Sequence, residues 1–218
     1  EAFGHLSEAD FLYENPRMRD LMHLGRTVGT PLLTVVDDGT HPTFMGTHAF
    51  DDEGTPVSRV QLITNGVLTA HLHSRETAAK MAEAPTGNAR ACNKHHAPLV
   101  RMRNTYIEKG TTPVAELFNG IDNGIYACDT IGGQTEFEMF TFSAAYGYRI
   151  ENGRRGELVR DITLTGNVFE TLGNIDAVGN DFQAYQGPGG CGKRNQSPLP
   201  ISYGAPHVRV RNVVVGGR

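Results

Sequence analysis

The chain has 218 residues and a formal net charge of −4, which is long enough to bury a sizeable core without disulfides. Its 20 Lys and Arg residues do not cluster, so charge gives no case for nucleic-acid binding. The apolar runs are too short to span a bilayer, and three scattered Cys residues form no disulfide framework, which fits a reducing, cytoplasmic compartment.

Four segments are expected to be helical, and local signals suggest where they begin and end. The first has apolar residues near helical spacing and is expected to end at Asn15-Pro16. Thr112-Pro113 resembles an N-cap followed by proline at the first helical position. The expected helices span 1–15, 76–82, 113–127 and 168–174.

Alternating or β-rich runs predict strands that pair mainly as hairpins. Asn65-Gly66 favours a type I′ turn, and Asn152-Gly153 predicts a second, looser hairpin. The stretch 186–205 is rich in Gly, Pro and Ser and is expected to be a long loop. Strands are expected over 32–36, 60–63, 67–72, 136–142, 146–150, 158–164 and 207–215. The pattern predicts a single α+β domain of predominantly antiparallel β sheets with a few helices.

The first five residues, Glu1-Ala2-Phe3-Gly4-His5, read as His-Glu-x-x-x-His without its leading His. A carboxylate and an imidazole are groups that a catalytic zinc site needs. Two His residues five apart lie about 140° apart on an ideal helix, so we expect a π-type bulge that Gly4 would ease. The alternative is an ordinary helix with an exposed Glu and His. Glu8 either holds the His5 imidazole or is solvated.

Cys191 lies among glycines, which permit close approach of the backbone to a metal or ligand. Lys193 and Arg194 would favour its thiolate. Cys191 is thus a candidate zinc ligand, a candidate nucleophile of a Cys peptidase, or a buried structural thiol. The other histidine pattern of note, His71 and His73, predicts a polar sheet face.

Nine stretches, in order along nearly the whole chain, resemble the C-terminal domain of the TldD/PmbA family of bacterial and archaeal metalloproteases, TldD branch. The matching stretches are Glu1-Ala2-Phe3-Gly4-His5 with Glu8 and Asp10, Thr34 to Thr40, Asp51 to Pro56, Ala84 to Asn88, Arg101-Met102 with Asn104-Thr105-Tyr106, Gly132-Gly133-Gln134, Tyr148 with Ile150-Glu151-Asn152-Gly153, Gly179-Asn180-Asp181, and Cys191-Gly192-Lys193 with Gln196-Ser197.

The resemblance implies a zinc peptidase that trims flexible or unfolded peptides. It assigns His5 and Cys191 as zinc ligands and Glu1 as general base, with a further His expected immediately before Glu1. Glu8 and Lys193 are candidates to support these ligands. Without that further His, we expect residues 1–218 to bind zinc weakly. Alone, they can be inactive as an enzyme.

The resemblance also implies a partner, either a TldE/PmbA-like subunit or a second copy, and an N-terminal domain outside residues 1–218. The PmbA branch lacks the zinc motif, so Glu1 and His5 favour a TldD-like subunit. Two alternatives stay open: a non-catalytic PmbA/TldE-like or peptide-binding subunit, and a Cys peptidase that uses Cys191.

Overall fold

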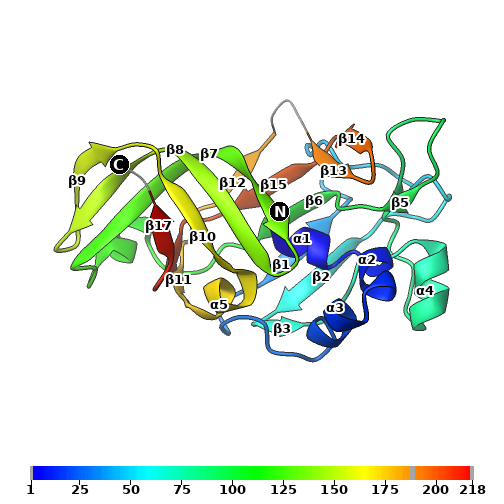
Figure 1. Cartoon of the computed structure of the whole chain (residues 1–218), viewed down its shortest axis with the longest axis horizontal. Coiled ribbons are helices and arrows are strands. Elements are labelled where there is room, and N and C mark those ends of the chain that lie inside the picture. Colours follow the sequence, from blue (N-terminus) through cyan, green and yellow to red (C-terminus); the bar gives the residue numbers. More distant parts are fainter. Residues whose placement is uncertain (1, 187–189, 217–218) are drawn as a thin grey trace.

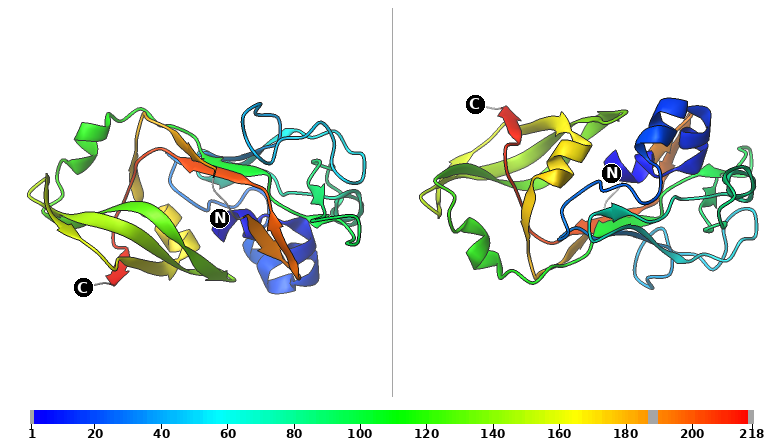
Figure 2. Two further views of the ribbon diagram at one scale, coloured as in Figure 1. Left: turned by 90° about the horizontal axis from the view of Figure 1, so that it is seen from above. Right: turned by 90° about the horizontal axis from the view of Figure 1, so that it is seen from below.

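Two β-sheets form the framework, and short helices pack on one face of the larger sheet (Figures 1 and 2). The computed structural model describes residues 2–186 and 190–216. Within these residues the larger sheet has the order β12-β15-β6-β1-β2-β3, and all of its pairs are antiparallel except β15 with β6. Its strands are β1 (Val35–Asp38), β2 (Arg59–Thr64), β3 (Val67–Leu68), β6 (Asn104–Ile107), β12 (Gln183–Tyr185) and β15 (Ser202–Ala205).

The second sheet has the order β17-β10-β8-β7, with β9 also paired to β8, and all of its pairs are antiparallel. Its strands are β7 (Asn123–Glu136), β8 (Met139–Glu151), β9 (Arg154–Val159), β10 (Thr163–Asn167) and β17 (Val214–Gly216). Three two-stranded ribbons complete the β structure: β4 (Ala89–Arg90) with β5 (Leu99–Val100), β11 (Ile175–Val178) with β16 (Val208–Val210), and β13 (Cys191–Lys193) with β14 (Gln196–Leu199). The predicted α+β class with mostly antiparallel sheets is confirmed.

The Asn65-Gly66 turn is confirmed, because Asn65 and Gly66 have φ values of 49° and 80° and join β2 to β3. The second strand is shorter than the expected 67–72, since β3 ends at Leu68. The prediction for β1 is wrong at both ends. Val35 begins the strand, and Asp37, which lies beyond the expected end at 36, is a buried strand residue. Its carboxyl group accepts hydrogen bonds from the Asn88 side chain, the Arg103 amide and the Thr105 hydroxyl, which only partly offset the burial that raises the pKa of Asp37.

The helix expected over 113–127 is wrong. Only η1 (Val114–Phe118) forms, as a 3₁₀ helix, and the chain then enters β7. Gly120, with φ of 74°, follows the end of η1, and β7 pairs with β8 along nearly its whole length. Cross-strand pairing therefore overrides a local apolar spacing that resembles a helix.

The N-terminal helix expected over 1–15 is also wrong, because the chain breaks into α1 (Ala2–Leu6) and α2 (Ala9–Glu14). At the break, the Leu72 amide donates to the Ser7 carbonyl at 2.8 Å, and the Ala9 amide donates to the Leu72 carbonyl at 3.0 Å. These bonds replace helical ones. Pro16 begins a further helix, α3 (Pro16–Leu21), instead of ending the first.

The remaining helices, α4 (Arg75–Met81) and α5 (Val168–Gly173), lie where they were expected. The stretch 186–205, expected to be a loop, contains β13, β14 and β15, while residues 187–189 lie outside the described part of the chain. The expected strand 207–215 is two strands, β16 and β17. None of the described helices has the length and apolar character needed to cross a bilayer.

The hydrophobic core lies between α1 to α3 and the larger sheet. It includes Phe3, Leu6 and Leu12 from the helices and Leu62 and Ile63 from β2. Figures 1 and 2 show α1 beside the tip of the long β7–β8 hairpin of the second sheet. Helix α1 therefore lies where the two sheets approach each other.

Candidate metal centre

His5 and Cys191 meet although 186 positions separate them in the sequence. His5 lies in α1, and Cys191 begins β13. The Nε2 atom of His5 is 3.4 Å from the Sγ atom of Cys191. Cys191 is fully buried, and His5 is partly buried. The structure thus brings together two side chains that the sequence singled out separately.

Glu8 orients the His5 ring from its other side. The Nδ1 atom of His5 lies 3.1 Å from Oε2 of Glu8, and an ionised carboxylate can only accept, so Nδ1 is the donor. The other Glu8 oxygen, Oε1, accepts from the Met102 amide at 3.1 Å. Glu8 has extended backbone angles at the α1–α2 break, so it reaches His5 from outside the helix. This arrangement directs the Nε2 atom of His5 toward Cys191.

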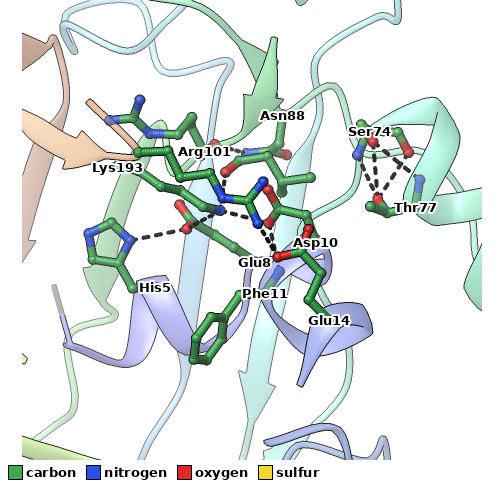
Figure 3. A network of polar contacts seen from close by, with 12 residues as sticks. His5, Glu8, Asp10, Phe11, Glu14, Ser74, Thr77, Asn88, Arg101 and Lys193 are labelled. Atoms are coloured by element: carbon green, nitrogen blue, oxygen red, sulfur yellow. Dashed lines mark hydrogen bonds and ion pairs between the residues drawn. The ribbon is translucent and has the colours of Figure 1, made fainter. Parts of the chain in front are cut away.

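Lys193 fixes Glu8 in turn (Figure 3). Its ammonium group donates to Oε2 of Glu8 at 2.8 Å, to Oδ1 of Asp10 at 2.6 Å and to the Val100 carbonyl at 2.9 Å. These three bonds use all three donors of an ammonium group. Cys191 and Lys193 are two positions apart in β13, so one short strand supplies both the thiol and the cation that holds Glu8.

The two basic residues after Cys191 both pair with carboxylates. Lys193 binds Glu8 and Asp10, and Arg194 pairs with the exposed carboxylate of Glu14. Both cations are therefore occupied by carboxylates on α2 and at its start. Gly190 permits the close turn into β13, because a Cβ atom there would lie 2.2 Å from the Leu199 carbonyl oxygen.

Arg101 is a site residue for which sequence reasoning gave no role. It is fully buried and donates to the Cys191 carbonyl at 2.6 Å and to the Gln196 carbonyl at 3.3 Å. It therefore holds both strands of the β13–β14 ribbon. Arg101 belongs to no periodic pattern. The sequence therefore marks it only as part of the stretch Arg101-Met102 that resembles the family.

Gly4 is needed for close packing. A Cβ atom at Gly4 would lie 1.9 Å from Sδ of Met102, the residue whose amide binds Glu8. The described part of α1 is an ordinary α-helix, so the π-type bulge expected around Gly4 is not seen in Ala2–Leu6. Glu1 itself lies outside the described residues.

The electrostatics of the cluster favour a cation. Burial lowers the pKa of His5, but hydrogen bonds and charge from Cys191 and Glu8 raise it by more, to about 10. Burial raises the pKa of Glu8, yet His5 and Lys193 together bring it below its ordinary value. Positive charge between Cys191 and Glu8 is therefore stabilised, as a site for a divalent ion requires.

A pocket of about 260 Å³ opens beside His5. It is lined by His5, Leu6, Glu8, Phe11, Thr135, Phe137, Gly192 and Lys193. Phe137 lies in the β7–β8 turn, with φ of 52°, and its ring centre is 6.2 Å from that of Phe11. Glu138, next to it, accepts from Arg17 of α3 at 2.6 Å. The expected continuous strand 136–142 is therefore wrong, and its start is the hairpin tip that covers the pocket.

A second cluster contradicts another expectation. His71 and His73 do not form a polar sheet face; both are buried and lie against Glu83. In the described chain, two groups bring three potential ligand atoms within 4.8 Å of one another: His5, Glu8 and Cys191, and His71, His73 and Glu83.

Comparison with known proteins places this chain in a family. The profile of the PmbA/TldA metallopeptidase C-terminal domain matches residues 1–217. A metalloprotease of Synechocystis sp. is 54% identical over 217 residues, covering 100% of this chain and 47% of that protein. A zinc metalloprotease TldD homolog of Saccharolobus solfataricus is 37% identical over 220 residues, covering 100% of this chain and 48% of that protein.

Among solved structures, TldE from Thermococcus kodakarensis matches 98% of this chain and 46% of its own with a TM-score of 0.78. At 20% identity, this match shows the fold alone. The chain spans about half the length of the relatives named above. The family profile covers nearly every residue and confirms the resemblance drawn from the sequence: the chain belongs to the PmbA/TldA metallopeptidase family and corresponds to its C-terminal domain.

Proposed function

We propose that this domain provides the metal-binding part of a zinc-dependent peptidase that acts on flexible or unfolded peptides as a TldD-like subunit. The observation that carries the proposal is the 3.4 Å approach of the His5 Nε2 atom to the Cys191 Sγ atom, with Glu8 fixing the far side of the ring. Relatives named as metalloproteases, one of them a zinc metalloprotease, support it.

The donor pair fits zinc in chemistry and in spacing. Zn–N bonds of about 2.0–2.1 Å and a Zn–S bond of about 2.3 Å, at a tetrahedral angle, require N and S to lie about 3.6 Å apart. The separation of 3.4 Å is within a small side-chain adjustment of that value. A third protein ligand would come from the residue before Glu1, as the resemblance implies.

The residues then have separate roles. Zinc held by His5 and Cys191 would supply a Lewis acid and a more acidic water at the scissile amide. Glu1 would accept a proton from the attacking water and deliver it to the leaving amine. Glu8 and Lys193 would act only by positioning, through the Nδ1 atom of His5. The role of Glu1 rests on the motif, since it lies outside the described residues.

The substrate and partner follow from the same proposal. The pocket beside His5 has Leu6, Phe11 and Phe137 on its walls, so it would take an apolar side chain of an extended peptide. A TldE/PmbA-like subunit or a second copy would complete the enclosure. The three free thiols fit a cytoplasmic location, which we include in the proposal.

One observation favours a second candidate, a Cys peptidase. Cys191, His5 and Glu8 form a continuous chain of contacts that resembles a nucleophile, a base and a group that orients the base. The full burial of Cys191 counts against it, because a nucleophile must reach the substrate carbonyl.

Zinc content and hydrolysis of an unstructured peptide, measured together in the full-length protein, separate the candidates. Cys191→Ala should lose zinc, and Glu1→Gln should keep zinc and lose about 10²–10⁴ in rate. Unchanged zinc in Cys191→Ala would remove Cys191 from the ligand set. If Cys191→Ser keeps zinc and is inactive while Glu1→Gln remains active, the Cys-peptidase candidate replaces the zinc peptidase.

A further inference from the structure

A second cluster of potential metal ligands, His71, His73 and Glu83, lies in a segment apart from His5 and Cys191. His71 and His73 flank Leu72 after β3, and Glu83 follows α4. The Nδ1 atom of His71 is 2.9 Å from Oε1 of Glu83, and the Nε2 atom of His73 is 3.1 Å from Oε2. His71 and His73 are 3% and 1% exposed, whereas the Glu83 side chain is 21% exposed. The two rings are therefore enclosed, and Glu83 is the member of the cluster that reaches solvent.

The outer nitrogen of each ring already has a partner. The Nε2 atom of His71 lies 2.7 Å from the Met22 carbonyl, which can only accept, so this nitrogen carries a proton. The Nδ1 atom of His73 lies 3.1 Å from the hydroxyl of Thr77, which also accepts from the Ser74 amide. The hydroxyl proton has the Ser74 side chain as acceptor, so its oxygen can accept from His73 as well.

The inner nitrogens of two neutral rings would then present lone pairs to a carboxylate. His71 would direct the Nδ1 lone pair at Glu83, an arrangement of two acceptors 2.9 Å apart. The Nε2 atom of His73 is buried and makes no hydrogen bond among the described residues, even though it lies 3.1 Å from Glu83. A buried polar atom without a hydrogen bond is costly, and a cation among these three groups removes the cost.

We propose that His71, His73 and Glu83 bind a divalent transition-metal ion, of which zinc is the best match, at a second site separate from His5 and Cys191. Two imidazoles and one carboxylate form a common ligand set for such ions. Metal bonds of about 2.0–2.1 Å at tetrahedral angles place neighbouring ligand atoms about 3.3 Å apart. The N–O separations of 2.9 and 3.1 Å need only a small opening to reach it.

The position of the cluster suggests a structural role. Leu72, between the two histidines, binds the Ser7 carbonyl through its amide and the Ala9 amide through its carbonyl. Glu8, which orients His5, lies between Ser7 and Ala9. A metal that joins residues 71–73 to Glu83 would therefore brace the backbone segment that positions Glu8.

The competing account is a proton in place of the metal, with at least one imidazolium paired to Glu83. Co²⁺ titration followed by absorption spectroscopy distinguishes the two. The Cys191→Ala variant removes the thiolate ligand of the first site, so any sulfur-to-cobalt charge-transfer band from that site disappears. We expect this variant to bind about one Co²⁺ with d–d bands and no sulfur band.

Glu83→Gln in the Cys191→Ala background should weaken that binding by at least about 100-fold, since even loss of an outer hydrogen-bond partner of a ligand costs 10–100-fold. Glu76→Gln, at an exposed position of α4 in the same region, is the matched control and should leave Co²⁺ affinity unchanged. His73→Gln, confirmed as folded by circular dichroism, should behave like Glu83→Gln. Absence of Co²⁺ uptake by Cys191→Ala would overturn the proposal, as would equal uptake with Glu83→Gln. Neither result affects zinc binding by His5 and Cys191.

Discussion

Lys193 is the residue whose removal tests the candidate metal centre most directly without adding or removing a metal ligand. Its ammonium group joins Glu8, Asp10 and the Val100 carbonyl, and its side chain is 12% exposed. In Lys193→Met the aliphatic stem can keep its packing, while the Glu8 carboxylate, 1% exposed, loses its only lysine or arginine partner among the described residues.

The expected cost follows from burial. Breaking a buried ion pair by removing one partner costs about 3–5 kcal/mol, because the remaining charge stays buried. Asp10, 14% exposed, can recover some hydration, and Glu8 keeps the Met102 amide and His5. We therefore expect the lower end, about 3 kcal/mol. For a chain of this length, that corresponds to roughly 6–12 °C in Tm.

Urea unfolding and thermal melts of Lys193→Met measure this loss, with Arg194→Met as the matched control. Arg194 also pairs with a carboxylate, Glu14, but both side chains are about half exposed, at 48% and 54%. An exposed pair contributes about 0–1 kcal/mol. If Lys193→Met lost no more stability than Arg194→Met, water would have to reach Glu8, and the buried network would not hold the site as argued.

Three further changes probe separate features. Glu8→Gln should weaken zinc binding about 10–100-fold by loosening the His5 ring; equal affinities in a chelator competition would contradict the positioning role. Gly4→Ala should cost about 1–3 kcal/mol in urea unfolding, since the new Cβ meets Met102, and a neutral result would refute the close contact. Asp176 has its pKa raised by burial but lowered by more through Arg209 and Arg211, so it lies below its ordinary value. Its stabilisation is present above that ordinary pKa of about 3.9 and is lost as pH falls through the lower folded value. Asp176→Asn should therefore destabilise the protein at neutral pH and not at the acid end of a pH series; a constant difference would refute the linkage.

Elements specified by local chemistry were predictable from the sequence. The Asn65-Gly66 turn and helices α4 and α5 needed only turn preference or capping, and Ser74 and Asn167 do cap those two helices. Elements specified by distant partners were not predictable. The strand at Asn123–Glu136 exists because β8 pairs with it, and the break at Ser7 exists because Leu72 occupies the hydrogen bonds of the helix.

The candidate site divides in the same way. The motif of Glu1 and His5 and the glycine-flanked Cys191 were visible in the sequence, but only the resemblance linked them across the chain. Arg101 and Phe137 had no local signal in the sequence. Arg101 contributes by donating to the Cys191 carbonyl, and Phe137 contributes by contacting Phe11 from a hairpin tip. The strand expected over 67–72 ends at Leu68, so His71 and His73 lie beyond it, and alternation could not show that both rings face Glu83.

The two candidate metal clusters, His5 with Cys191 and His71 with His73 and Glu83, are connected through the backbone of Leu72. This connection explains why the N-terminal helix is broken at Ser7. A continuous helix through Ser7 and Glu8 would keep those peptide groups within the helix and leave Leu72 without its partners. The break instead exposes the Ser7 carbonyl and the Ala9 amide to Leu72 at 2.8 and 3.0 Å. Glu8 is thereby held in extended geometry by main-chain bonds on both sides, which fixes it more firmly than its side-chain contacts alone. The geometry at His5 therefore depends in part on the segment that carries His71 and His73, because Leu72 in that segment forms these main-chain bonds.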